Sequence, residues 1–474
     1  MLNSISKMLK IMKRKLVILS LASLSITMSC KDFVSKDDVS PNEPSVATLG
    51  TLLPVIEVSL FSSYTGSLSR NSSMFIQHTA GIAFQSNDYN RYLLTETDIS
   101  NDWTTLYNAG FVNCNDLIQR AGSANPYYSG IAKISKAMIL GIATDCWGDI
   151  PNREAGKGQD NLSPKYDSQE LVIQDIQTLL SDAISDLKKP QGDNALLPGD
   201  DDFIFGGNPQ SWIKSAYILK ARYANRLSKR DPSGSATLAL QYSDSAASYS
   251  SGSDMKAIFS SKSNELNQWF AFNSERENYM KMSATLMDTL RSLSDPRLSI
   301  YAGKDDNGDY TGVPNGGTSS SNSYLGLKFA AEDAKLPMVT EFEVKFIEAE
   351  AALRSGNTSR AKLAYEAAIR TNLTGLGVES ADIDAYLAGP AAFNNEASTS
   401  ELQALIMFQK WIAMFTQPEA WTDWRRTNLP ALTPNPDGVL NQIPRRYPTE
   451  QRERNNNPNA TVISDLTTKV WWDN

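Results

Sequence analysis

The chain has 474 residues, 41% of them hydrophobic and 21% charged, which is enough apolar content for one large domain or two or three smaller ones. It carries 45 basic and 53 acidic residues, a net charge of −8 at pH 7, so binding to nucleic acid or attraction to anionic lipid is not expected. With a single histidine and three cysteines, most metal and hydrolase chemistries lack their usual parts, and we predict no metal, no cofactor and no catalytic residue.

The first 29 residues have the pattern of a secretory signal peptide. Lys13, Arg14 and Lys15 form a basic region, and residues 16–26 form an apolar run that is too short to span a bilayer. The run ends at Thr-Met-Ser-Cys, which resembles the lipobox of bacterial lipoproteins. We predict cleavage before Cys30, which would then carry acyl chains. The alternatives are an ordinary signal peptide or a buried helix, with Cys30 uninvolved.

Residues 30–45 are polar, charged and interrupted by proline, which predicts a flexible lipidated tether ahead of one folded domain at 46–474. Residues 1–29 hold five basic and no acidic residues, so 40 basic residues would remain against 53 acidic ones, a net charge of −13. Such a surface does not attract anionic head groups. Lipid would therefore supply the membrane contact, because several acyl chains anchor a protein stably where one does not.

Helical periodicity dominates from residue 46 to the C-terminus, and no set of alternating strands is visible. The clearest helix pair lies at 340–370. Residues 342–353 carry an apolar stripe, Gly356 ends that helix, and Asn357 or Thr358 can cap the next one. Alanines on the facing sides of both helices permit the close approach of a tetratricopeptide-type hairpin.

Other segments repeat this plan less regularly: 129–147 with 166–188, 210–229 with 236–249, and 400–415. We therefore predict an all-α fold, a tetratricopeptide-like scaffold of helical hairpins with degenerate repeats. Between the helices we expect long irregular loops, which are more often functional than decorative, at 85–102, 189–209, 250–284, 302–337, 371–399 and 428–474.

Three isolated features have a structural and a functional interpretation. Cys114 and Cys146 lie in helix-like segments and could form a disulfide or remain buried free thiols. His78, in a helix-like stretch, is expected to be packed rather than to bind a ligand. Asp305, Asn307 and Asp309 alternate as at the start of an EF-hand loop, but the glycine and the closing glutamate are missing, so we expect a surface turn.

Five segments in order along the chain resemble the SusD-like (RagB/SusD) nutrient-binding lipoproteins of Bacteroidetes-type bacteria. They are Trp147-Gly148-Asp149-Ile150-Pro151, Asp295-Pro296-Arg297-Leu298, residues 346–353, residues 409–413 with 419–427, and residues 443–448. We expect the tryptophans of these segments, Trp147, Trp411 and Trp421, to fill the core, and Asp423, Arg425 and Arg426 to form buried ion pairs.

The resemblance implies an α-rich fold, a lipid anchor on the outer membrane facing the cell surface, and binding of glycan or another nutrient. It also implies a partner, a SusC-like TonB-dependent β-barrel over which the lipoprotein sits as a hinged lid. Lys36-Asp37-Asp38, close behind Cys30, is similar to the acidic signal that exports such lipoproteins to the surface.

A sugar site needs exposed aromatic faces flanked by polar groups that pair with hydroxyls. Residues 85–92 and 267–279 supply that mixture. We predict Tyr89 and Trp269 as stacking platforms and Asn87 and Arg276 as their hydrogen-bonding partners, while Trp103 and Tyr107 are expected in the core.

The function predicted from the sequence is the binding of glycan or a related nutrient and its delivery to the transporter, without catalysis. The alternatives are a peptide-uptake version of the same lid, a tetratricopeptide-like interaction scaffold or adhesin, and a glycosidase that uses two carboxylates.

Overall fold

The computed structural model describes residues 4–12 and 47–474. Residues 4–12 are helical and belong to an N-terminal unit separate from the unit at 49–474. Cys30, the cleavage site and the tether lie outside the described residues, so lipidation and the domain limits stay predictions. In the part of the chain that the structure describes, no helix is both long enough and apolar enough to cross a membrane.

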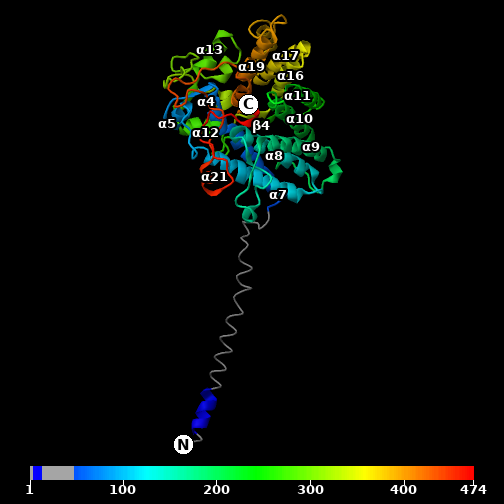
Figure 1. The fold of residues 1–474 in the computed structure, drawn as a ribbon, viewed down its shortest axis with the longest axis vertical. Coiled ribbons are helices and arrows are strands. Elements are labelled where there is room, and N and C mark those ends of the chain that lie inside the picture. Colours follow the sequence, from blue (N-terminus) through cyan, green and yellow to red (C-terminus); the bar gives the residue numbers. More distant parts are fainter. Residues whose placement is uncertain (1–3, 13–46) are drawn as a thin grey trace. The chain divides into compact units, whose positions relative to one another are not determined.

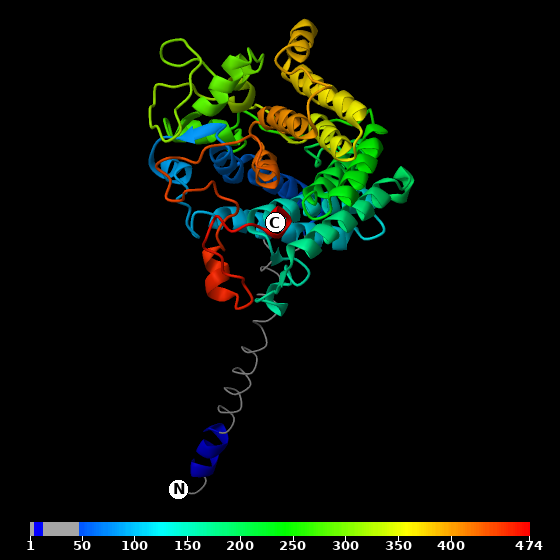
Figure 2. The ribbon, with the colours of Figure 1, turned by 45° about the horizontal axis from the view of Figure 1, so that its top comes forward.

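Helical hairpins form most of the 49–474 unit. α8 (Pro126–Trp147) packs on α9 (Gln169–Leu187), α10 (Pro209–Arg226) on α11 (Pro232–Ala247), and α16 (Glu341–Arg354) on α17 (Thr358–Leu376). Figures 1 and 2 show the three pairs side by side in chain order, from teal to yellow. Because α9 also contacts α10, and α11 contacts α16, the hairpins form a continuous stack. The predicted tetratricopeptide-like all-α scaffold is confirmed.

The helix ends follow local sequence signals. Gly356 adopts a φ of +76° between α16 and α17, and Asn357, not Thr358, caps α17 by accepting the Arg360 N–H at 3.0 Å. α19 (Thr399–Ala413) begins with a capping box between Ser398 and Glu401. The sequence predicted a cap at Asn357 or Thr358, and the cap at Ser398 is an addition of the structure.

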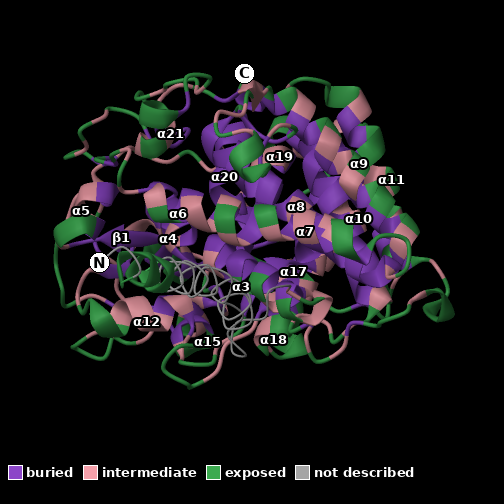
Figure 3. Cartoon of the chain, turned by 90° about the horizontal axis from the view of Figure 1, so that it is seen from below, coloured by how far each residue is buried: buried purple, intermediate pink, exposed green. Residues whose placement is uncertain are grey.

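A second set of helices packs against α8 and fills the centre of the unit. α3 (Leu49–Thr65) contacts α8, the π-helix η1 (Thr105–Phe111) and α7 (Val112–Ala121), while α20 (Glu419–Thr427) contacts α19 and α4 (Ser67–Phe75). α4 and α20 are buried over most of their length, and Figure 3 shows buried residues at the centre of the unit. Trp147, Trp411 and Trp421 are between 1% and 3% exposed and Trp103 is 7% exposed, which confirms their predicted place in the core.

Short antiparallel strand pairs join segments that are distant in sequence. β1 (Thr79–Gly81) pairs with β5 (Met280–Met282), β2 (Ile150–Pro151) with β3 (Tyr166–Asp167), and β4 (Met255–Ala257) with β6 (Leu336–Val339). Because such two-stranded ladders are marginal alone, they depend on the helices around them.

The predicted irregular stretches hold more helix than expected, and those predictions were wrong in part. They contain α5 (Phe84–Asn90), α6 (Ser100–Thr104), α12 (Gln268–Glu275), α15 (Leu327–Ala330), α18 (Ser380–Ala388) and α21 (Gln451–Asn456), as well as the end of α17. Helices of one or two turns show no clear periodicity, and tertiary contacts stabilise them.

The thiols of Cys114 and Cys146 are both buried and free, so no disulfide joins them. Burial raises the pKa of the Cys114 thiol to about 12 and that of Cys146 well above its usual value. Both side chains therefore act as small apolar groups of the core.

A network of buried ion pairs joins α8, α10, α16, α19 and α20. Arg222 on α10 makes a bidentate pair with Glu343 at 2.6 Å, and Arg226 binds Glu419 at 2.6 Å and Asp145 at 2.9 Å. Further members are Arg426 with Glu350 and Asp423, Arg354 with Glu350, and Lys410 with Asp423. The predicted buried pairing of Arg426 with Asp423 is confirmed. Arg425 instead stacks on Trp421 at 3.6 Å and donates to backbone carbonyls.

The arginines of the network hold Glu350 ionised. Burial alone would raise the pKa of Glu350, but Arg426 and Arg354 lower it to about 2. Breaking a buried pair leaves an uncompensated charge, which costs more than the pair contributes.

We predict that Arg426→Met lowers the free energy of unfolding by about 3–5 kcal/mol, because Glu350 and Asp423 both lose a buried partner. Urea unfolding measures this change. Arg120→Met is the matched control, since its pair with Asp116 is exposed (36% and 34%) and contributes under about 1 kcal/mol. Equal losses in the two variants would contradict the role assigned to the network.

Glu57 on α3 gives a second, pH-dependent test. Its carboxyl is fully buried and accepts the Phe203 N–H at 2.8 Å, and burial together with the Asp202 carboxylate raises its pKa from 4.5 to about 10. The folded state therefore favours the protonated form. The contribution of Glu57 to stability is greatest below pH 4.5 and falls as the pH rises toward 10.

We expect Glu57→Gln, which keeps a neutral hydrogen-bonding group, to gain stability relative to the unsubstituted protein as the pH rises from 5 to 9. The gain cannot exceed about 1.4 kcal/mol per pH unit for a single group. Thermal unfolding across this range measures the difference, and a difference that does not change with pH would show that Glu57 is ionised in the folded protein.

Candidate functional site

The two segments predicted to bind ligand lie next to each other in the fold. β1 leads into α5 and β5 follows α12, so the β1–β5 ladder, with Gly81 opposite Met280, brings the two segments together. The Ile82 N–H also donates to the Tyr279 carbonyl at 2.8 Å. Figure 1 shows α5 and α12 on the side of the unit away from the hairpin stack.

Three rings from these segments form what we term the aromatic platform, made of Phe84, Phe272 and Tyr279. Phe84 and Tyr279 stack with ring centroids 5.0 Å apart and planes 25° apart, and Phe272 meets Tyr279 edge-on at 6.2 Å. Phe84 is 73% exposed. An exposed aromatic stack is a surface on which the apolar face of a sugar ring can lie.

Polar groups surround the platform. Arg276 lies 5.4 Å from the Phe272 ring and pairs with Glu275 at 2.8 Å on the surface. Asn278 accepts the Tyr324 hydroxyl at 2.6 Å, and the Lys281 ammonium lies 3.2 Å from the centroid of the Tyr324 ring. Amide, guanidinium and hydroxyl groups are therefore available beside the rings to pair with ligand hydroxyls.

The backbone around the platform is strained. Within the described residues, seven non-glycine residues have positive φ, and four of them, Gln77, Phe84, Tyr92 and Asn278, lie in or beside the segments that carry the platform. Each such conformation costs on the order of 1–3 kcal/mol and persists only where surrounding contacts impose it. Phe84 (φ +48°) and Asn278 (φ +60°) thus have positions that the fold imposes against local preference.

The four residues predicted from the sequence lie at different depths. Arg276 is exposed and Asn87, on α5, is half-buried, so both can be reached from solvent. Tyr89 is 8% exposed, and its hydroxyl accepts a hydrogen bond from Gln85. Trp269 is fully buried, and its indole N–H has no partner among the described groups. The exposed ring is therefore Phe84, with Tyr279 half-buried and Tyr89 and Trp269 beneath the surface.

The sequence did not predict Phe84 as a platform residue, because Phe84 lies just before the segment 85–92 that was chosen for its polar composition. Its neighbour Ala83 carries no signal of a ligand site. The strand pair sets the segment of Phe84 against that of Tyr279, and three-residue ladders of this kind leave no periodic pattern to detect.

The remaining candidate residues have structural roles. Asp305 closes a surface turn by accepting the N–H groups of Asn307 and Asp309, both at 2.9 Å, and the Thr311 hydroxyl at 2.7 Å, as expected. Across the described residues no cluster of acidic, histidine or cysteine side chains could hold a metal ion. His78 is buried 4.9 Å from the Trp411 ring, and burial lowers its pKa to about 3. It is thus a neutral core residue at physiological pH.

The fold and the platform together define a class of protein: a helical scaffold that presents a partly exposed aromatic cluster on one side. Over residues 41–448 the sequence matches the SusD-like family, described as starch-binding and associating with the outer membrane, and the chain belongs to this family. A comparison with curated protein sequences finds no significant match.

Solved structures of the family share the fold. A chitin-binding SusD homolog from Flavobacterium johnsoniae is 23% identical with a TM-score of 0.78, over 89% of this chain and 98% of that one. A SusD/RagB family protein from Bacteroides thetaiotaomicron is 22% identical with a TM-score of 0.74, over 90% and 99%. A SusD homolog from Bacteroides uniformis is 23% identical with a TM-score of 0.73, over 90% and 99%.

Proposed function

We propose that this protein captures a glycan on the aromatic platform and delivers it to a SusC-like TonB-dependent barrel in the outer membrane. The observation that carries the proposal is the Phe84–Tyr279 stack, 5.0 Å between centroids, with Phe84 73% exposed. Tyr279 supports one face of the Phe84 ring, and the open side of that ring offers an apolar surface of the size that a sugar ring covers. The family description and the chitin-binding relative support carbohydrate as the ligand class.

Each predicted ligand residue has a role in this proposal. Asn87 and Arg276 pair with hydroxyl groups at the two sides of the platform, since both can be reached from solvent. Tyr89 and Trp269 support α5 and α12 from below, where their burial places them. The ligand is thus held by stacking at the centre and by hydrogen bonds at the edges.

The anchor and the partner complete the proposal. Lipidated Cys30 would hold the protein on the outer membrane, Lys36-Asp37-Asp38 would direct it to the cell surface, and the tether would let the body move as a lid on the barrel. A pull-down from the outer-membrane fraction tests the partner. Recovery of a large TonB-dependent barrel supports the lid, and recovery of other surface proteins alone would favour the adhesin.

Binding without chemistry is the mode of action that we propose. The one histidine is buried and neutral, and family members are binding proteins. A carboxylate pair acting as a glycosidase would release product from polysaccharide. We expect no product when the protein is incubated with the glycan that it binds.

We predict that Phe84→Ala weakens glycan binding about tenfold, because a lost stacking contact is on the order of 1 kcal/mol. Titration calorimetry against a panel of neutral oligosaccharides, including those of chitin and starch, measures this effect. The fold should be unaffected, since Phe84 is 73% exposed.

Leu363→Ala is the matched control, because Leu363 is 68% exposed on α17, in the hairpin stack. It should bind like the unsubstituted protein. If Phe84→Ala also binds with unchanged affinity, the platform is not the site. If no glycan binds but peptides do, the peptide-uptake version of the lid replaces this proposal.

A further inference from the structure

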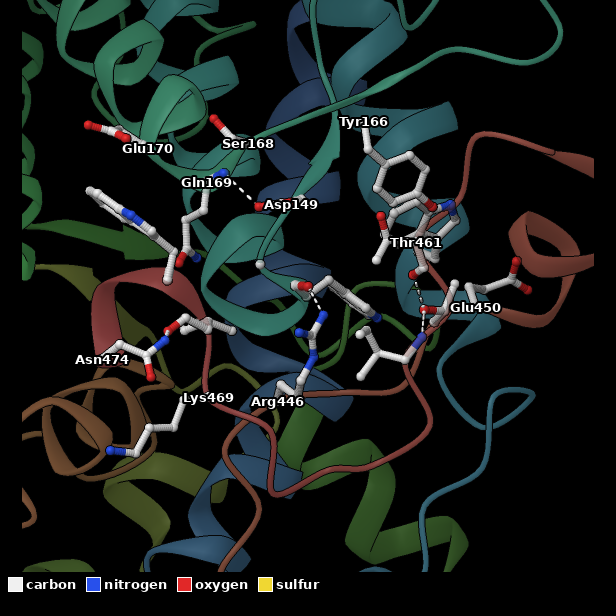
Figure 4. A pocket seen from close by; sticks show the side chains of 17 residues that line it. Asp149, Tyr166, Ser168, Gln169, Glu170, Arg446, Glu450, Thr461, Lys469 and Asn474 are labelled. Carbon is white, nitrogen blue, oxygen red and sulfur yellow. Dashed lines mark hydrogen bonds between the residues drawn. The ribbon is translucent and has the colours of Figure 1, made fainter.

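A cavity that is separate from the aromatic platform lies between the end of α8, the start of α9 and the C-terminal segment of the chain. Its volume is about 400 Å³, and its lining includes Trp147, Asp149, Tyr166, Gln169, Arg446 and Trp471. Figure 4 shows the Arg446 guanidinium among these side chains. The volume falls within the range of small-molecule sites, and no residue of the aromatic platform lines this cavity.

Arg446 is the unusual member of this lining. Its side chain is only 9% exposed, its Nη2 donates to the Trp147 carbonyl, and no carboxylate among the described residues forms an ion pair with it. The adjacent Arg445 shows the usual arrangement, since it pairs with Asp473 through two nitrogens. Burial lowers the pKa of Arg446, and the nearby Asp149 charge partly opposes this shift. The guanidinium of an arginine nevertheless stays charged.

Gly148 leaves the guanidinium uncovered. It has a φ of +81°, and a side-chain carbon at this position would lie 3.6 Å and 3.7 Å from the two terminal nitrogens of Arg446. The Gly-Asp pair of the Trp-Gly-Asp-Ile-Pro segment thus keeps space beside a buried cation. Buried charges are normally paired, so an unpaired one that faces a cavity indicates a partner that is not part of the chain.

The acidic groups in the lining are held by other donors. Asp149 accepts the Gln169 N–H at 2.8 Å at the start of α9. Glu450 accepts the Ser100 hydroxyl at 2.6 Å and the N–H groups of Arg452 and Glu453 at 2.7 Å and 3.0 Å. Glu170 is exposed and does not face the guanidinium in Figure 4.

Lys469, the other cation of the lining, is exposed, and Figure 4 shows its ammonium directed away from Arg446. Arg446 is therefore the cation that a ligand in this cavity meets.

We propose that this cavity is a second binding site, distinct from the aromatic platform, for a small molecule that bears a carboxylate, such as a sugar acid. The carboxylate pairs with Arg446, whose planar donors suit its two oxygens. The rings of Trp147 and Tyr166 bound the space beside it, and the hydroxyl groups of Ser168 and Thr461 are available to a sugar ring. The site goes beyond the proposed function, because it requires neither the platform nor a transporter.

D-Glucuronate and D-glucose test the proposal, because they share a ring and differ at the carboxylate. Calorimetric titration of the purified protein should show glucuronate binding at least about tenfold more tightly than glucose. Equal binding of the two sugars, or no binding of either, overturns the proposal.

Arg446→Gln should weaken glucuronate binding about tenfold or more, since it removes the charged partner. Lys469→Gln removes the same charge at the rim and should change the affinity by less than about twofold. An equal loss in both variants would mean that diffuse charge attracts the ligand, and retained affinity in Arg446→Gln would mean that Arg446 is not the partner. Either result overturns the proposal.

Arg446 also binds the Trp147 carbonyl, so the Arg446→Gln variant could lose the fold as well as the ligand. A second variant tests the cavity without changing Arg446. Thr461 is exposed at the rim, and its side chain lines the cavity. Thr461→Trp should fill the space and abolish glucuronate binding, while Phe84→Ala should leave it unchanged. If Thr461→Trp still binds glucuronate with unchanged affinity, or if Phe84→Ala no longer binds it, the ligand lies elsewhere. Either result overturns the proposal. Glucuronate binding in the cavity does not depend on glycan binding at the platform, so the two proposals can fail separately.

Discussion

The buried ion-pair network is the constraint on which the rest of the structure depends. Arg222 and Arg226 project from α10 to acids on α8, α16 and α20, and Arg426 returns from α20 to Glu350 on α16. Each charge is held away from water and has a partner on another helix. A shifted register of these helices would leave buried charges unpaired, so the network disfavours other registers. The stacked hairpins and the central helices share a single arrangement for this reason.

That rigid interior determines what the irregular side of the molecule can do. The platform residues belong to short helices and loops, and they occupy unfavourable backbone conformations at Phe84 and Asn278. Conformations of this kind persist only when the surroundings impose them. The β1–β5 ladder holds the two platform segments together, since it pairs the segment after α4 with the segment before α13 (Ala284–Ser292). A preformed platform costs less conformational entropy when a ligand binds.

The SusD-like segments recognised in the sequence turn out to serve the interior more than the platform. Trp421 and Arg425 pack on each other, Arg426 joins the network, and Arg297 pairs with Asp295 at 2.6 Å in a site without solvent exposure. The segments that identify the family are thus the ones whose residues pack the scaffold. Phe84 and Tyr279, which form the aromatic stack, lie outside those segments. The Gly148–Arg446 pair is the exception, because a scaffold segment there borders a cavity.

The sequence by itself determined the all-α class, the three helical hairpins and a helix cap at Asn357 or Thr358, because these depend on residues within one or two turns of each other. It also placed Trp147, Trp411 and Trp421 in the core from their helical spacing. It could not determine the short helices α5 and α12, the burial of Tyr89 and Trp269, or the exposure of Phe84. Those were decided by the tertiary structure, since a ring is buried or exposed according to which distant segment covers it. The pairing of residues 79–81 with 280–282 joins segments about two hundred positions apart, and only the folded chain brings them into contact.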